Sequence, residues 1–137
     1  MFSRLLLATD GSDHSHRAAD KAIELANLSG EGCIEIVYVV DGNKSKSDVL
    51  QYGDSASLKR EKLLSVFRDK FKKAGIYSKV TILHGVPAET LIDYTNKNSF
   101  DCLILGSRGR SRVQTMILGS VSHKVMKHVN IPVLLVK

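Results

Sequence analysis

Residues 106–120, GSRGRSRVQTMILGS, combine glycine, arginine and serine in a pattern that suits phosphate binding. Glycines let backbone N–H groups approach an anion closely. Gly119 and Ser120 precede a segment of helical periodicity, and the unpaired amides of a helix's first turn favour an anion. The residues that could contact phosphate are Gly106, Arg108, Gly109, Arg110, Arg112, Gly119, Ser120 and Ser122. Taken alone, the segment predicts either a phosphate site or a flexible basic connection.

A second segment, ATDGSDHS at residues 8–15, carries complementary chemistry. The carboxylate of Asp10 can accept hydrogen bonds from a ribose hydroxyl or an adenine amino group, and it would repel phosphate. We therefore expect sugar and base at this segment and phosphates at residues 106–120. Neither a Walker A loop nor the GxGxxG fingerprint of dinucleotide-binding enzymes is present at these positions, which argues against a Rossmann dehydrogenase.

Apolar runs alternate with segments of helical periodicity along the chain. Strands are expected at 4–10, 33–41, 76–85, 101–107 and 131–137, helices at 13–30, 57–74, from Pro87 and after Gly119, and a polar connection at 42–57. The alternation predicts an α/β fold, a single-domain, doubly wound five-stranded parallel sheet over residues 1–137 with helices on both faces. With the strand order 3-2-1-4-5, the two chemical segments leave neighbouring strands where the order reverses, which is where open parallel sheets bind ligands.

Composition excludes several classes of protein. Hydrophobic residues make up 43% and charged residues 25% of the chain, which is typical of a globular protein. No apolar run approaches the roughly 20 residues of a membrane helix, and MFSRLLLATDGS turns polar too early for a secretory signal, so we expect a cytoplasmic protein. The net charge of +6 permits an anionic partner, but nucleic acid is not expected because aromatic residues do not interleave with the basic ones. Cys33 and Cys102 are expected to be reduced, buried thiols.

The histidines are not expected to be catalytic. His14 and His16 follow Asp10 closely, but residues so near in sequence at a helix start do not converge as a Ser/His/Asp triad. We expect both to be solvated residues of the first helical turns. His123 and His128 are five residues apart, so they do not share a helix face as a metal-binding pair would, and a surface role is expected.

The spacing Gly106-x2-Gly109-x9-Gly119-Ser120 resembles the nucleotide-binding signature of the universal stress protein family, in its ATP-binding subgroup. The segments LLLATDGSDHS, IVYVVD and HGVPAETLIDY resemble other parts of that family, and residues 101–137 resemble its whole C-terminal third. The resemblance covers essentially the full chain. It implies a Rossmann-like fold of the adenine nucleotide alpha hydrolase type and a stress-response module that binds ATP or another adenine nucleotide.

The resemblance also assigns roles by position. Asp10 matches the family aspartate near ribose and adenine, Ala8 and Thr9 line the same turn, and the backbone of Val39 matches the group that meets adenine. The phosphate and ribose segment is matched by Gly106, Arg108, Gly109, Gly119, Ser120, Val121 and Ser122. A divalent metal often accompanies the phosphates in this family. No pair of carboxylates converges near residues 106–120, so we expect Mg²⁺ there to be held by phosphate oxygens and water, and we name no protein ligand.

Assembly and activity are the remaining expectations. The resemblance implies a homodimer through the last strand, residues 131–136, where an apolar edge invites pairing with its twin unless Pro132 and Lys137 blunt it. The alternative function is a slow ATP hydrolase or phosphotransferase, which needs a positioned nucleophile. Gln114 is the only glutamine of the phosphate segment, and no catalytic residue is predicted. A third interpretation is an interaction module without a ligand.

Overall fold

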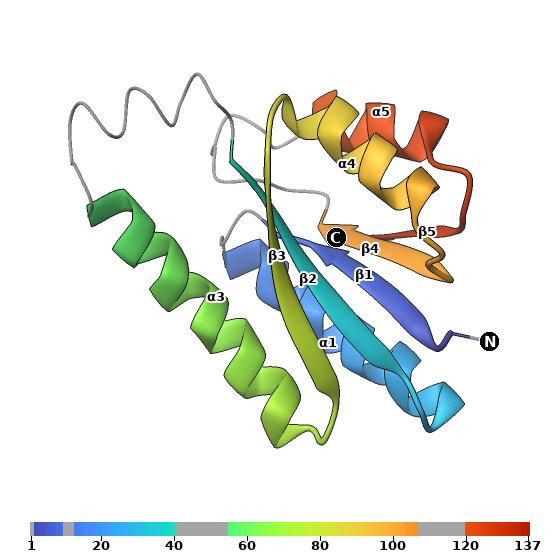
Figure 1. The fold of residues 1–137 in the computed structure, drawn as a ribbon. Helices are drawn as coiled ribbons and strands as arrows, with labels where there is room; N and C mark the ends of the chain where they lie inside the picture. Colours follow the sequence, from blue (N-terminus) through green and yellow to red (C-terminus); the bar gives the residue numbers. More distant parts are fainter. Residues whose placement is uncertain (1, 10–12, 41–54, 107–119) are drawn as a thin grey trace.

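The computed structural model describes residues 2–9, 13–40, 55–106 and 120–137. These residues form a five-stranded parallel sheet in the order β3-β2-β1-β4-β5, and the predicted strand order is confirmed (Figure 1). The strands are β1 (Arg4–Ala8), β2 (Cys33–Val40), β3 (Tyr77–His84), β4 (Cys102–Gly106) and β5 (Val133–Val136). The helices are α1 (Asp13–Ser29), α3 (Ser55–Lys73), α4 (Pro87–Lys97) and α5 (Ser120–His128).

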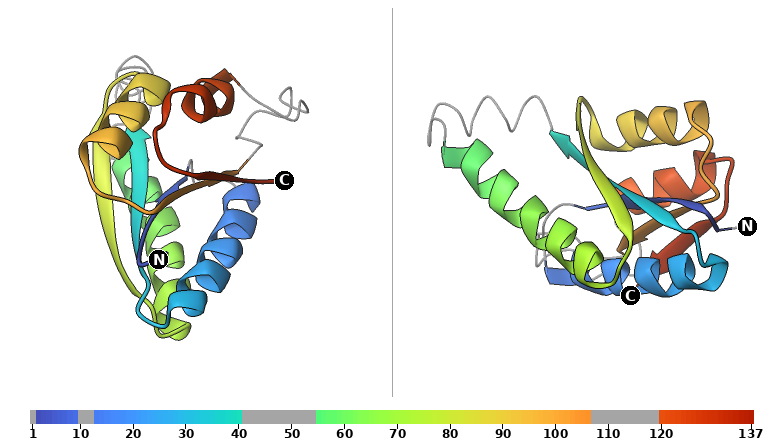
Figure 2. Two further views of the ribbon diagram at one scale, coloured as in Figure 1. Left: turned by 90° about the vertical axis from the view of Figure 1, so that its right-hand side faces the viewer. Right: turned by 60° about the horizontal axis from the view of Figure 1, so that its bottom comes forward.

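Helices cover both faces of the sheet, as predicted. The chain adds strands in one direction from β1 to β3 and in the opposite direction from β4 to β5, so α1 and α3 lie on one face and α4 and α5 on the other (Figure 2). In β1, Leu5 and Leu7 belong to the core under α1 and α3, while Leu6 belongs to the core under α4 and α5. Burial on both faces explains why this strand is a continuous apolar run.

Two glycines and one proline delimit the helices. Gly30 follows α1 with φ +76°, and Gly75 follows α3 with φ +75°. This left-handed conformation is a common helix stop, and glycine adopts it without a steric penalty. Pro87 occupies the first turn of α4, where a missing backbone N–H costs no helical hydrogen bond. All three boundaries agree with the sequence prediction.

A buried carboxylate ties α4 to the sheet. Glu35 on β2 is only 6% exposed, and its Oε2 accepts hydrogen bonds from the hydroxyls of Thr81, at 3.0 Å, and Tyr94. Lys79 on β3 lies 3.4 Å from the other carboxylate oxygen. Burial, with the hydrogen bond to Glu35, raises the pKa of Tyr94 above its usual range. The pairing satisfies a charge that would otherwise be costly to bury.

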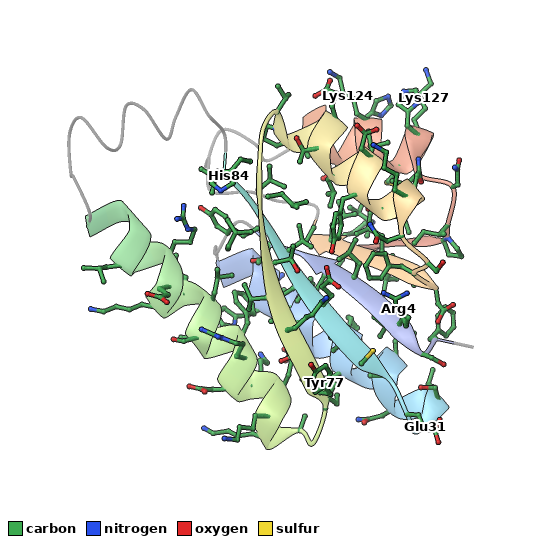
Figure 3. The ribbon with its side chains drawn as sticks, in the orientation of Figure 1. Arg4, Glu31, Tyr77, His84, Lys124 and Lys127 are labelled. Atoms are coloured by element: carbon green, nitrogen blue, oxygen red, sulfur yellow. The ribbon has the colours of Figure 1, made fainter. Side chains whose placement is uncertain are left out.

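The amino end of the sheet is closed by a second polar cluster, on the side where Figure 3 labels Arg4. The Asp101 carboxylate accepts hydrogen bonds from the backbone N–H groups of Ser3 and Arg4, each at 2.9 Å. The Arg4 guanidinium donates to the carbonyl oxygen of Ser99 at 2.7 Å and lies 4.9 Å from the ring centroid of Phe100. The hydrogen bond from the Arg4 amide is the main cause that lowers the pKa of Asp101.

The cysteines depart in part from expectation. Cys102 is buried and free, as predicted. Cys33 is free but only half-buried, so its predicted burial is wrong. It is the first residue of β2, opposite Arg4 and Tyr77, and both of these neighbours are themselves exposed. Among the described residues, no helix has the length and apolar character needed to cross a bilayer.

Candidate functional site

The two chemical segments of the sequence leave adjacent strands. Ala8, at the end of β1, stands opposite Leu105 of β4 in the parallel ladder, and β4 continues one residue further to Gly106. The strand order reverses between β1 and β4, because the helices that follow them cover opposite faces of the sheet. The predicted neighbourhood of the first and fourth strands is therefore confirmed.

The first turn of α5 lies against the end of β4. Ser122 is 7% exposed, and its hydroxyl donates a hydrogen bond to the carbonyl oxygen of Gly106 at 3.5 Å. Val121, beside it, is 39% exposed. The first four amides of a helix have no partner within the helix and carry partial positive charge. This end of α5 can therefore receive an anion at the carboxyl edge of the sheet.

The backbone of Val39 points to the β1 side of the sheet, beyond the last residue of the β1 ladder. The carbonyl of Val37 accepts the N–H of Thr9 at 3.0 Å, so it points toward β1, while the carbonyl of Val40 accepts the N–H of Gly85 and points toward β3. Because these directions alternate along a strand, the N–H and C=O of Val39 point to the β1 side. The β1 ladder ends at Ala8, opposite Val37, so no β1 residue in the described ranges pairs with Val39. A flat heterocycle with a donor beside an acceptor can bind such an edge.

Apolar side chains line this edge on the face of α4 and α5. Ala8, Val39 and Leu83 are half-buried and pack against the same core cluster. Leu83 stands directly opposite Val39 in the β2–β3 ladder. Leu83 was not predicted from the sequence, because alternation assigns it to a strand face but does not give the register that brings it beside Val39. Together these three side chains offer an apolar contact for a planar ring.

The structure brings together part of the predicted site. Positions at the carboxyl edge or in the first turn of α5 are held by Ala8, Thr9, Val39, Gly106, Ser120, Val121 and Ser122. Asp10, Arg108, Gly109 and Gly119 lie outside the described residues, as do Arg110, Arg112 and Gln114. The role of Asp10 and of the arginines therefore stays a prediction. Within the described ranges, no group of three His, Cys, Asp or Glu side chains is arranged to hold a metal ion.

The histidines lie apart from this edge or at its margin. His16 stacks on the buried ring of Phe67, with centroids 4.7 Å apart, so the expectation that it is solvated is wrong. The reason is that α3 packs beside α1 and places Phe67 under the His16 ring. His84 is exposed at the end of β3 (Figure 3), and His123 and His128 are exposed on α5. The surface role predicted for the last two agrees with that exposure.

Comparison with known proteins gives concordant results. The model described as the universal stress protein family matches residues 1–137. The universal stress protein YxiE of Bacillus subtilis is 30% identical over 155 aligned residues, which cover 100% of both chains.

Two solved structures have similar folds. The structure of a universal stress protein of Methanocaldococcus jannaschii superimposes with a TM-score of 0.82 at 26% identity, covering 100% of this chain and 96% of that one. A universal stress protein crystallised in complex with cAMP has a TM-score of 0.73 at 26% identity, covering 98% of this chain and 96% of that one.

Proposed function

This chain belongs to the universal stress protein family, and we propose that it works in the cytoplasm as a regulatory stress-response module that binds an adenine nucleotide, ATP foremost. The observation that carries the proposal is the pairing of two features at one edge of the sheet. One is the backbone of Val39 beyond the end of β1, and the other is the first turn of α5, fixed to β4 by Ser122. Bound nucleotide would order the surrounding segments and so alter which partners the protein meets.

Each part of the nucleotide has a counterpart in the chain. The backbone of Val39 would bind the edge of adenine, with Ala8, Val39 and Leu83 against its ring. Asp10, with Thr9 beside it, would accept hydrogen bonds from the ribose. The phosphates would lie at Gly106, Arg108, Gly109, Gly119, Ser120, Val121 and Ser122. The relative crystallised with cAMP supports an adenine nucleotide as the ligand class.

A magnesium ion fits this arrangement only as a companion of the phosphates. The described residues supply hydroxyl and amide groups at the carboxyl edge but no cluster of metal ligands. Since Mg²⁺ retains several waters and is commonly bound through phosphate oxygens, we propose that those oxygens and water hold it. The residues of this chain would then orient the nucleotide rather than the metal.

The decisive experiment is nucleotide titration of glycine variants. A side chain at Gly109 or Gly119 would crowd the phosphates, so Gly109→Val and Gly119→Val should each weaken ATP binding about tenfold or more in isothermal titration calorimetry. Thermal unfolding of each variant serves as the folding control. Wild-type protein should bind ATP more tightly than adenosine. Wild-type affinity in both glycine variants would remove the phosphate segment from the proposal.

We also propose a homodimer through β5. This strand lies at the sheet edge, and all four of its residues are aliphatic and partly exposed. Met126 of α5 is 42% exposed and, at two residues from Lys124, lies on the helix side away from α4. It would extend the apolar surface of the β5 edge. Residues 131–136 of two copies would then pair edge to edge.

Two proline substitutions separate the outer and inner sides of β5. The carbonyl of Pro132 accepts the N–H of Leu103, so the backbone of Leu134 also points toward β4 and that of Leu135 points outward. Leu135→Pro should convert dimer to monomer in light scattering while the fold survives. Leu134→Pro removes a ladder donor inside the sheet and should destabilise the fold itself. A Leu135→Pro protein that stays dimeric would place the interface elsewhere.

A further inference from the structure

The net positive charge of this chain arises from its last quarter. All 14 acidic residues lie at or before Asp101, together with 14 of the 20 lysines and arginines. Residues 102–137 hold the other six basic residues and no acidic one, so they account for the whole net charge of +6. The phosphate segment contains three of the six. The remaining three are Lys124, Lys127 and Lys137.

Two of those lysines lie on the outer surface of α5. Lys124 and Lys127 are exposed, and Figure 3 shows both on the side of α5 that faces away from the sheet. His123 and His128, also exposed, flank them on the same helix. Lys124 lies 3.5 Å from a carboxylate oxygen of Glu89 on α4, with both side chains more than half exposed. Such a surface pair is weak and can exchange for another partner.

A groove lies on the surface where α5 packs beside α4. It has a volume of about 620 Å³ and is lined by Glu89, Ile92, Asp93, Lys124 and His128. Glu89 and Asp93 are one helical turn apart and form an acidic wall on α4. Lys124 and His128 are spaced the same way and form the opposite wall, on α5, where the lysine contributes a positive charge. Ile92, half-buried, contributes the apolar surface between them.

We propose that this groove binds an amphipathic segment of another protein, with carboxylates along the flank that faces α5. An aliphatic side chain of that segment would lie over Ile92, and neutral or basic side chains would face Glu89 and Asp93. The opposite charges of the two walls favour a protein segment over nucleic acid or a membrane. Nucleic acid or an anionic membrane presents negative charge across its whole surface, and either would bring that charge against the acidic wall of α4.

The groove is separate from the proposed nucleotide site. Lys124 and His128 lie one and two turns beyond the first turn of α5, on its exposed side, whereas Ser122 is buried against β4. A substitution on the groove walls therefore leaves the candidate phosphate contacts in place. The two proposals can fail independently.

Helical peptides of matched composition test the proposal. The striped peptide carries a row of glutamates, a central row of leucines and an opposite row of lysines, and the scrambled peptide holds the same residues in mixed order. Isotope-labelled full-length protein is titrated with each and followed by NMR. The striped peptide should bind more tightly than the scrambled one and shift resonances of α4 and α5. Equal binding of the two peptides would overturn the proposal.

Variants that remove a single charge provide a second test of the groove. Lys124→Gln should weaken striped-peptide binding about threefold, because it removes one solvent-exposed charge contact from the α5 wall of the groove. Lys72→Gln, an exposed lysine in the last turn of α3, makes the same change in net charge and should have no effect. Equal losses in Lys124→Gln and Lys72→Gln would show that only the net charge matters and would contradict binding in the groove. ATP affinity should stay constant throughout.

The same variants test the polyanion alternatives. Duplex DNA and phosphatidylglycerol vesicles should bind more weakly than the striped peptide. Glu89→Gln removes a carboxylate from the α4 wall, so it should improve binding of a peptide whose two flanks are both glutamate. If DNA or vesicles bind more tightly than the striped peptide and respond to Lys124→Gln, the groove serves a polyanion and the protein-segment proposal is wrong.

Discussion

The two ends of the sheet differ in what lies at them: side-chain hydrogen bonds at the amino end, and strand and helix termini at the carboxyl end. At the amino end, Asp101 accepts the amides of Ser3 and Arg4, and the side chain of Arg4 reaches the carbonyl of Ser99. At the carboxyl end, β1 stops at Ala8 while β2 continues to Val40. The amino end is held together by its own side chains, and the carboxyl end carries the strand and helix termini of the proposed ligand site.

This difference teaches where the molecule can tolerate change. Contacts at the amino end join segments nearly a hundred residues apart, so their loss should affect stability. Groups at the carboxyl end are aimed at a proposed ligand, so their loss should affect binding. The comparison predicts that the two effects are separable, which the following substitutions test in order of decreasing effect on the free energy of unfolding.

Gly32→Ala should have the largest effect. Gly32 lies between α1 and β2, and an added Cβ would meet the backbone of Ala26 at 2.6 Å. Backbone cannot move aside cheaply, so we expect a loss of about 2 kcal/mol in urea unfolding. Gly75→Ala is the matched control, since a Cβ there meets nothing within 4 Å and only the φ of +75° costs about 1 kcal/mol. Reduced ATP affinity in Gly32→Ala would contradict the expectation that changes at the amino end of the sheet affect stability but not binding.

Asp101→Asn should have a smaller, pH-dependent effect. We expect about 1 kcal/mol at neutral pH, because the carboxylate is largely exposed and water competes for its hydrogen bonds. The pKa of Asp101 is lower in the folded protein than its ordinary value of 3.8. Its stabilisation is therefore complete above that ordinary value and is lost as the pH falls through the folded pKa. The difference in stability between wild type and variant should therefore shrink in thermal unfolding as the pH falls below 3.8. A difference that stays constant with pH would assign the effect to something other than ionisation.

Ser122→Ala should have the smallest effect on stability of the three substitutions. It tests the carboxyl end of the sheet, where the expected effect is on ligand binding. Its hydrogen bond to Gly106 is 3.5 Å long, so its loss should cost under about 1 kcal/mol. Loosening the first turn of α5 should nevertheless weaken ATP binding about threefold. Ser65→Ala on α3 is the control, because that hydroxyl donates a hydrogen bond to the Lys62 carbonyl of its own helix. Equal ATP affinity in Ser122→Ala and Ser65→Ala would count against a binding role for this turn.

Much of the fold follows from local patterns. Continuous apolar runs such as Leu5–Leu7 indicate strands buried on both faces, and glycines after helices indicate their ends. The expected strand order 3-2-1-4-5, which puts the two chemical segments after neighbouring strands, was confirmed. The predicted first strand, residues 4–10, was too long, because β1 ends at Ala8 and Thr9 already lies outside the strand.

The tertiary contacts could not be predicted in the same way. In CIEIVYVV, alternation places Glu35 on a strand face but does not reveal its partners, Thr81 and Tyr94, which lie 46 and 59 residues further on. The stacking of His16 on Phe67 and the pairing of Leu83 with Val39 likewise depend on packing and register. At the site, the chemistry of individual segments was readable, whereas the direction of the Val39 backbone required the ladder itself.

The central position of β1 has a consequence for biosynthesis. Leu5, Leu6 and Leu7 are synthesised early, yet β4, which covers one side of their strand, emerges from the ribosome nearly a hundred residues later. These three leucines are almost fully buried in the folded protein. In a nascent chain that lacks β4, part of their surface stays exposed to water. Incomplete chains that end before β4 should therefore be prone to aggregation and should depend on chaperones. Once the last quarter of the chain is released, the protein should fold without them.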